Sequence, residues 1–263
     1  MKQLLTYWNF NLSSLLLFVI IAVVVIVTKS FTNKKIFATS FILLIICLFS
    51  PLQILSSHYL FSAHMIIHVL LLLCIGPLLI MGLPANTKQF RELFIFLKHH
   101  PIAGWLIAVG MMWFWHIPVV FNSVMTSMHH SGLNFISIIE ALGLICAGIL
   151  FSAPIVHSNK EYRIDSLSGV VYLFTACIGC SLLGLLITFA PAGTYHHFLS
   201  MHDPYALNKI IVEDWGMTQS IDQQAAGLIM WVPCCLIYVT GAMYLLVHWF
   251  KQKEEIIAYS KEL

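Results

Sequence analysis

Charged side chains are scarce in this 263-residue sequence, where aspartate, glutamate, lysine and arginine together make up 9% of the chain. An average soluble domain contains about 25%. So little charge excludes an ordinary soluble domain, and a net charge of +2 is too small to indicate a nucleic-acid partner. Hydrophobic residues account for 60%. The composition therefore predicts an all-α, polytopic membrane protein that forms one domain, residues 1–263, in a lipid bilayer.

Other sequence features are missing as well. We find no catalytic triad, phosphate-binding loop or nucleotide-binding motif in the sequence, so no enzymatic activity is expected. No internal repeat is apparent. The first apolar run lacks the small-residue cleavage site of a signal peptide and ends at Lys29, which predicts a retained helix.

Cysteine is present seven times, an odd number, and every cysteine lies in an apolar segment, so no disulfide framework is expected. Cys177 and Cys180 form a CxxC pattern in the middle of an apolar run. Redox and zinc motifs of this kind normally lie at a loop or a helix start. The simplest interpretation is that both are small packing residues, and the same holds for Cys234 and Cys235.

Apolar runs long enough to cross a bilayer recur along the chain. A hydrocarbon core of ~30 Å requires about 17 to 25 helical residues. Such runs lie near 12–28, 36–55, 62–83, 102–121, 133–156, 167–190 and 223–250. In the third run, Pro77 removes a backbone donor and predicts a kink. The sequence therefore predicts seven transmembrane helices, with a short interfacial helix in the charged, semi-amphipathic segment 87–100.

The basic residues divide unequally between the two sides of these seven predicted spans. Only Lys2 and Lys209 fall on the side of the N-terminus. The other eleven of the 13 are Lys29, Lys34, Lys35, Lys88, Arg91, Lys98, Lys160, Arg163, Lys251, Lys253 and Lys261. Because basic residues gather in cytoplasmic loops, this split predicts that the N-terminus lies outside and the C-terminus in the cytoplasm.

Histidines gather on the predicted outer side, which holds nine of the 13. His64 and His68 lie four residues apart near the outer end of the third span, and His116 lies near the outer end of the fourth. Imidazole binds copper, zinc, iron and nickel, and side chains at i and i+4 of a helix are about 5–6 Å apart at Cβ. A single histidine at a membrane interface is most simply an interfacial polar tip. Three at one depth favour a metal site.

Glu140 lies about two turns inside the fifth span. An ionisable group at that depth is costly unless it is paired or neutral. Gly143 and Ala147 follow on the same face, which suggests packing against another helix. We therefore expect Glu140 to face the bundle interior and to pair with an outer histidine. A protonated side chain with one interhelical hydrogen bond is the structural alternative.

Four motifs, HMIIH, GPLLIMGLP, WHIPVVFN and DQQAAGLIMWVP, follow one another along the chain. In this order they resemble the CtaG family, the assembly factors of caa(3)-type cytochrome c oxidase, over nearly the whole sequence. The resemblance implies a bacterial plasma-membrane protein that helps to mature a haem-copper oxidase by serving its copper sites, with oxidase subunits as partners. Asn134 departs from the family pattern, which often has a histidine there, and the loop 191–222 is long. The polar motif residues, carried over by position, are His64, His68, His116, His130, Asp222 and Gln223.

Together, the residues and the resemblance predict a copper site on the outer side. Met65 is an optional soft ligand, although it lies about 100° round an ideal helix from His64. The candidate metal ligands are His64, His68, His116, His130, Glu140 and Asp222. A haem-binding protein with two axial histidines and a copper transporter remain alternatives. A seven-helix photoreceptor is disfavoured, because the seventh span lacks a lysine between Asp222 and His248 for a Schiff base.

Overall fold

The computed structural model describes residues 7–8, 10–27, 33–83, 90–128, 133–191, 193–195 and 203–261. All regular structure in these ranges is helical, which confirms the predicted all-α class. The α-helices are α1 (Leu12–Val27), α2 (Lys34–Phe49), α3 (Pro51–His58), α4 (Phe61–Val69), α5 (Gly76–Gly82), α6 (Arg91–His99), α7 (Pro101–Trp115), α8 (Pro118–Met128), α9 (Phe135–Val156), α10 (Ser166–Phe189) and α11 (Gln219–Lys261). The π-helical turns are η2 (Leu70–Ile75) and η5 (Ile210–Asp214), and η4 (Lys160–Tyr162) is a 3-10 turn.

Four helices are long and apolar enough to cross a membrane: the continuous run Phe61–Gly82, α9, α10 and the part Gln219–Glu254 of α11. The number rises to six if each of two bent helix pairs crosses as one unit. These pairs are α2 with α3, bent by 47°, and α6 with α7, bent by 92°. α1 is apolar but has only 16 residues. The structure thus supports a multi-pass membrane protein, while seven spans and their orientation stay predictions.

Prolines mark the place where the predicted second span divides and the places where the predicted fourth span begins and divides. Pro51 and Pro101 each lie in the first turn of a new helix, where the missing N–H has no helical partner to lose. Pro118 begins α8 just after the end of α7, so the predicted span 102–121 covers two helices. The described part of the predicted interfacial segment 87–100 is α6, which meets α7 at the 92° bend.

The third predicted span is continuous from Phe61 to Gly82. The disturbance expected at Pro77 takes the form of η2, a π-helical turn that ends at Ile75. Turns of this kind are rare inside helices and frequently lie near functional sites. In this chain the turn begins two residues after His68.

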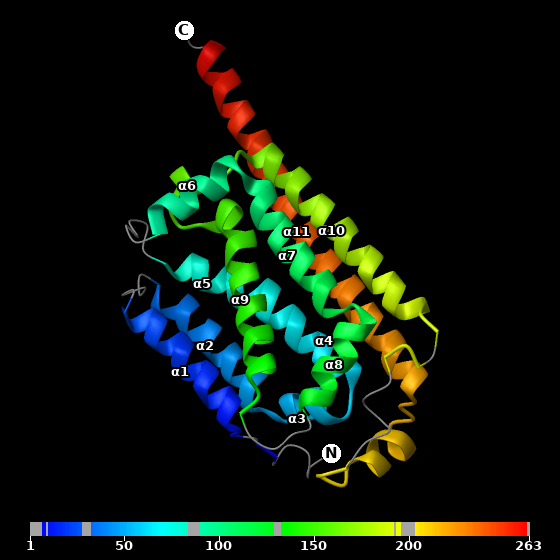
Figure 1. Cartoon of the computed structure of the whole chain (residues 1–263). Helices are drawn as coiled ribbons and strands as arrows, with labels where there is room; N and C mark the ends of the chain where they lie inside the picture. Colours follow the sequence, from blue (N-terminus) through cyan, green and yellow to red (C-terminus); the bar gives the residue numbers. More distant parts are fainter. Residues whose placement is uncertain are drawn as a thin grey trace.

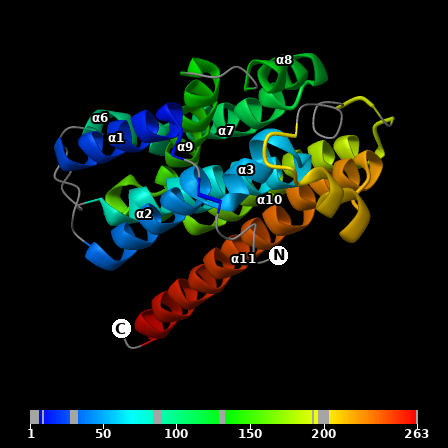
Figure 2. The ribbon, with the colours of Figure 1, turned by 90° about the horizontal axis from the view of Figure 1, so that it is seen from below.

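The helices form one bundle with α9 near its centre, where it crosses the run α4–η2–α5 (Figure 1). α10 packs along α11, and the beginning of α11 packs against α4. α11 extends past the other helices, as Figure 2 shows from a second side. Its C-terminal half exposes Met243, Tyr244, Val247 and Phe250. This face is therefore available to lipid.

Backbone meets backbone where α9 crosses α4–η2–α5. A Cβ added to Gly148 of α9 would collide with the Leu72 carbonyl oxygen, and one added to Gly76 would lie 2.7 Å from the Gly148 carbonyl carbon. Only a hydrogen atom fits at these positions, as in other close helix crossings in membranes. The crossing holds Glu140, about two turns before Gly148, next to His68, one turn before Leu72.

We predict that Gly148→Ala destabilises the protein by about 1–3 kcal/mol, because the added methyl group overpacks the crossing. Gly110→Ala on α7 is the matched control, since a Cβ there would meet nothing within 4 Å. Alanine favours a helix over glycine, so the control should be neutral or slightly stabilising. The thermal unfolding midpoints of both variants in the same detergent provide the measurement, and equal midpoints would contradict the close crossing.

Candidate metal centre

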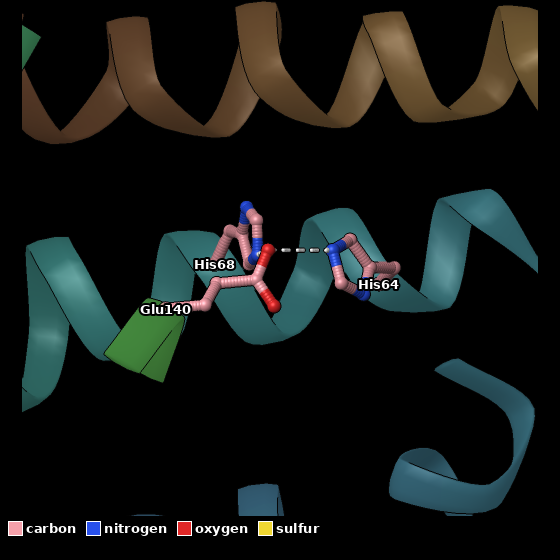
Figure 3. Close-up of side chains that lie close together, drawn as sticks. All are labelled: His64, His68 and Glu140. Atoms are coloured by element: carbon pink, nitrogen blue, oxygen red, sulfur yellow. Dashed lines mark ion pairs between the residues drawn. The ribbon is translucent and has the colours of Figure 1, made fainter. Parts of the chain in front are cut away.

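Two histidines of α4 and a glutamate of α9 meet inside the bundle (Figure 3). His64 and His68 are one turn apart, and their ring centroids are 4.2 Å apart. Oε1 of Glu140 lies 3.5 Å from Nε2 of His64 and 3.3 Å from Nε2 of His68. The three side chains are buried. The predicted pairing of Glu140 with histidines is therefore confirmed, and its partners are His64 and His68.

The ligand atoms of this group lie close together, but they leave hydrogen-bonding capacity of the imidazoles unused. One ligand atom from each of the three residues lies within 4.8 Å of the other two. Neither ring nitrogen of His68 makes a hydrogen bond to a described residue, although Nε2 lies 3.3 Å from the Glu140 carboxylate. Leaving a buried polar group in this state costs about 1–3 kcal/mol. A metal ion held between the three side chains would satisfy the imidazoles and the carboxylate at once, so the residues fit a metal.

Ser56 of α3 orients His64. The Ser56 hydroxyl lies 3.3 Å from Nδ1 of His64, and both residues are buried. A hydrogen bond at Nδ1 fixes the ring and directs Nε2 toward Glu140, which is how a metal-binding imidazole is usually held. Sequence reasoning missed Ser56. Its signal was a pair of hydroxyl residues, Ser56 and Ser57, directly after the predicted span 36–55.

His116 lies beside this group at the end of α7, with its ring centroid 5.2 Å from that of His68. Its Nδ1 is 2.5 Å from the Met112 carbonyl oxygen, which can only accept, so Nδ1 carries the proton. In the neutral ring Nε2 then presents a lone pair, and this atom faces the Met65 sulfur at 3.0 Å. The angular offset of Met65 from His64 on α4 therefore turns it toward His116. The two atoms form a nitrogen–sulfur pair suited to a soft cation.

Asp222 lies apart from the cluster and holds the start of α4. Its carboxylate accepts hydrogen bonds from the backbone N–H of Phe61 at 2.6 Å and of Ser62 at 3.0 Å, and from the Ser62 hydroxyl. The N-cap residue of α4, Leu60, has no side-chain hydrogen bond of its own. Asp222 thus caps α4 from the first turn of α11, and so fixes the helix that carries both histidines.

Gln223 and His130 are the other residues that the family resemblance suggested. The Gln223 amide donates to the carbonyl oxygens of Ile187 and Ala190, which ties α11 to the end of α10. His130 lies outside the described residues. The structure thus brings His64, His68 and Glu140 together. It places His116 next to them and leaves Asp222 in a capping position.

A small polar cavity of about 70 Å³ leads to the histidines between α1, α2, α3, α4 and α9. Its polar lining is dense for the inside of an apolar bundle. The uncharged polar residues in the lining are Asn11, Ser13, Ser14, Gln53, Ser56, Ser57 and Ser137. The cavity has room for a few water molecules, and the hydroxyl and amide groups supply their partners.

The segment from Asp203 to η5 packs over the turn between α3 and α4. The Tyr59 hydroxyl donates to Asp203 at 2.5 Å, and the backbone N–H groups of Leu207 and Asn208 donate to the same carboxylate. Burial raises the pKa of Asp203, but these hydrogen bonds outweigh burial and the pKa lies below its usual value. Ile211 packs in the same small hydrophobic cluster as Tyr59. The segment therefore fixes the end of α3 that carries Ser56.

We predict that Asp222→Ala lowers stability by about 1–2 kcal/mol and leaves the metal stoichiometry of the folded protein unchanged, because the residue caps α4. Asp222→Asn keeps a hydrogen-bond acceptor and should lower the stability less than Asp222→Ala does. Thermal unfolding and metal analysis of the folded fraction check this together. A loss of metal as large as that caused by His64→Ala would instead make Asp222 a ligand.

Comparison with known proteins gives one match. A family model described as cytochrome c oxidase caa3 assembly factor matches residues 21–252, which is most of the chain. No curated protein and no solved structure matches. The matched range contains every residue of the candidate centre.

Proposed function

The chain belongs to the cytochrome c oxidase caa3 assembly factor family, and we propose that it serves oxidase assembly by binding copper at His64, His68 and Glu140 and passing the ion on. Its partners are then oxidase subunits in the bacterial plasma membrane, and it acts without catalysing a reaction. The observation that carries this proposal is the buried group of three ligand residues with unsatisfied His68 nitrogens.

Charge supports a cation at this position. Glu140 is buried in an apolar helix bundle, where a lone carboxylate is costly. The site offers two neutral imidazoles and one carboxylate, so a monovalent cation would leave it without net charge. Cu(I) meets that condition, and imidazole is one of its ligands.

The neighbouring pair of His116 and Met65 favours copper over zinc. Zinc is found with cysteine, histidine and carboxylate ligands. A thioether sulfur, as in Met65, prefers Cu(I). Because the His116 and His68 rings are 5.2 Å apart between centroids, an ion could pass between the two ligand groups with small side-chain movements. This arrangement suits a protein that binds copper and then releases it.

The polar cavity supplies a route from the outer side. It reaches from the first residues of α1 and α9 and the end of α3 down to His64 and His68. The described basic residues near the opposite ends of the helices include Lys34, Lys98, Arg163 and Lys251. With these residues in the cytoplasm, copper would enter from outside, where the copper sites of the oxidase are to be served.

A haem with two axial histidines finds little support in this geometry. His64 and His68 share one helix with their ring centroids 4.2 Å apart, and the adjoining cavity of about 70 Å³ is far smaller than a porphyrin. A visible Soret band in the purified protein would reverse this preference. A copper transporter would use the same site, and transport of copper by the purified protein in vesicles distinguishes it from an assembly factor.

We predict that His64→Ala and His68→Ala each lower copper binding, and that the double variant abolishes binding at this site. Glu140→Gln keeps the shape and loses the charge, so copper should bind about tenfold more weakly or worse. His248→Ala, an exposed histidine near the other end of the bundle, is the control and should bind normally. Copper stoichiometry of purified protein is measured beside oxidase activity in membranes.

The outcomes of that experiment separate two roles. Full copper occupancy in the double variant would show that this pair is not the site. If the wild type binds no copper and the double variant still loses oxidase activity, the same residues serve the oxidase by another means.

We predict that the N-terminus lies outside and the C-terminus in the cytoplasm. In a variant without native cysteines, a cysteine introduced at Ser158, between α9 and η4, should react with a membrane-impermeant reagent only after the cells are opened. A cysteine at Glu213, which lies in η5 of the last outer loop, should react in intact cells. The exposed positions of both residues make them suitable for labelling. Reaction at Ser158→Cys in intact cells would reverse the orientation and, with it, the side from which copper arrives.

A further inference from the structure

Four of the seven cysteines meet at one place between α10 and α11. The Cys177 thiol donates to the Cys235 sulfur at 3.0 Å. One turn along α10, Cys180 and Cys234 are neighbours that interact with each other across the same interface. Each helix thus contributes one thiol to each pair. The two cysteines of the CxxC pattern on α10 therefore face the two adjacent cysteines of α11 across the helix interface.

A close helix crossing creates this meeting. A Cβ added to Gly184 of α10 would lie 2.7 Å from the Gly227 carbonyl oxygen, and one added to Gly227 would lie 2.6 Å from the Gly184 carbonyl oxygen. The two backbones therefore touch one to two turns away from the thiols, after them on α10 and before them on α11. At such a distance the short side chains of Cys180 and Cys234 reach each other directly.

The surroundings of the thiols are polar but uncharged. The Ser181 hydroxyl donates to the Cys177 carbonyl oxygen at 2.7 Å, and its oxygen lies 3.1 Å from the Cys235 sulfur. The Cys180 thiol lies 3.7 Å from the Tyr238 hydroxyl. A cysteine that only fills space needs none of these partners. The Cys177 and Cys235 sulfur atoms are instead held together by a hydrogen bond, and Cys180 is held by Tyr238 next to Cys234.

We propose that these two thiol pairs, Cys177 with Cys235 and Cys180 with Cys234, form a second metal-binding site that takes Cu(I), one ion for each pair. Thiolate sulfur is the protein ligand that best selects this ion, which accepts as few as two ligands. On binding, each Cu(I) replaces one thiol proton, which leaves the protein. The pair then carries one thiolate, one thiol and one monovalent cation, so no net charge is buried in the membrane.

This site lies apart from the histidine centre. Cys234 is twelve residues beyond Asp222 on α11, or about 18 Å along the helix. Asp222 holds the first residues of α4, whereas His68 is only seven residues into that helix. The thiols therefore lie deeper in the bundle than the histidines. The proposal does not depend on copper binding by His64 and His68, and the two sites are tested separately.

The experiment uses the full-length protein in detergent without oxygen, titrated with Cu(I) against a chromophoric Cu(I) chelator. Cu(I)–thiolate bonds give a near-ultraviolet charge-transfer band that histidine and methionine ligands lack. The variant with serine at all four positions should lose this band and two equivalents of Cu(I). Cys177→Ser with Cys235→Ser should lose one equivalent and about half of the band.

Two control variants sharpen the result. Serine at Cys47, Cys74 and Cys146 leaves only the four paired thiols and should keep the whole band. His64→Ala with His68→Ala should also keep it, which separates this site from the proposed function. An unchanged band in the four-serine variant, or loss of the band in the three-serine control, would overturn the proposal.

A measurement on the unmutated protein covers the case in which a variant does not fold. The protein is alkylated with a membrane-permeant maleimide, with and without Cu(I), and each cysteine is quantified by peptide mapping. Cu(I) should slow the reaction of Cys177, Cys180, Cys234 and Cys235 at least tenfold and leave that of the exposed Cys146 unchanged. Equal slowing at all cysteines, or none at the four, would contradict the site.

Discussion

The contact of one buried carboxylate with two imidazoles is the interaction on which this structure depends. A carboxylate such as Glu140 is costly in the apolar interior unless it has polar partners, and His64 and His68 are the side chains that meet it. Their approach requires α9 to touch the backbone of α4–η2–α5, so the glycine crossing at Gly148 follows from the same requirement. The carboxylate, the histidines and the glycine crossing therefore form one unit.

The helix that carries the histidines is fixed by groups outside the cluster. Asp222 reaches from α11 to cap the start of α4, and Ser56 reaches from α3 to one imidazole. Tyr59, at the end of α3, is tied to Asp203 in the segment before η5. The start of α4 and the neighbouring end of α3 are thus held by residues of the last third of the chain, Asp222 and Asp203. Such support is what a site needs if its ligands are to stay in place when the ion leaves.

The bundle offers two kinds of ligand at two depths. Near the start of α4 are imidazoles, a carboxylate and a thioether, and farther along the bundle, between α10 and α11, are paired thiols. Both sets lie where a pair of glycines lets helices touch, at Gly148 with Gly76 and at Gly184 with Gly227. Close backbone contact brings short side chains together across an interface. The family to which the chain belongs assembles an oxidase, and both ligand sets suit the copper that such an enzyme contains.

The sequence by itself determined the all-α membrane class, the family and three members of the cluster, because hydropathy and the i, i+4 spacing of His64 and His68 are properties of a single helix. A buried glutamate is costly without a polar partner, and this predicted that Glu140 pairs with a histidine. Only the tertiary structure decided which of the other polar residues join it. Asp222 was expected as a ligand and lies at a helix start, because capping depends on where α11 meets α4 and not on local pattern. Likewise, Cys177 and Cys180 looked like packing residues until α11 brought Cys234 and Cys235 against them, since contacts between distant segments leave no periodicity in the sequence.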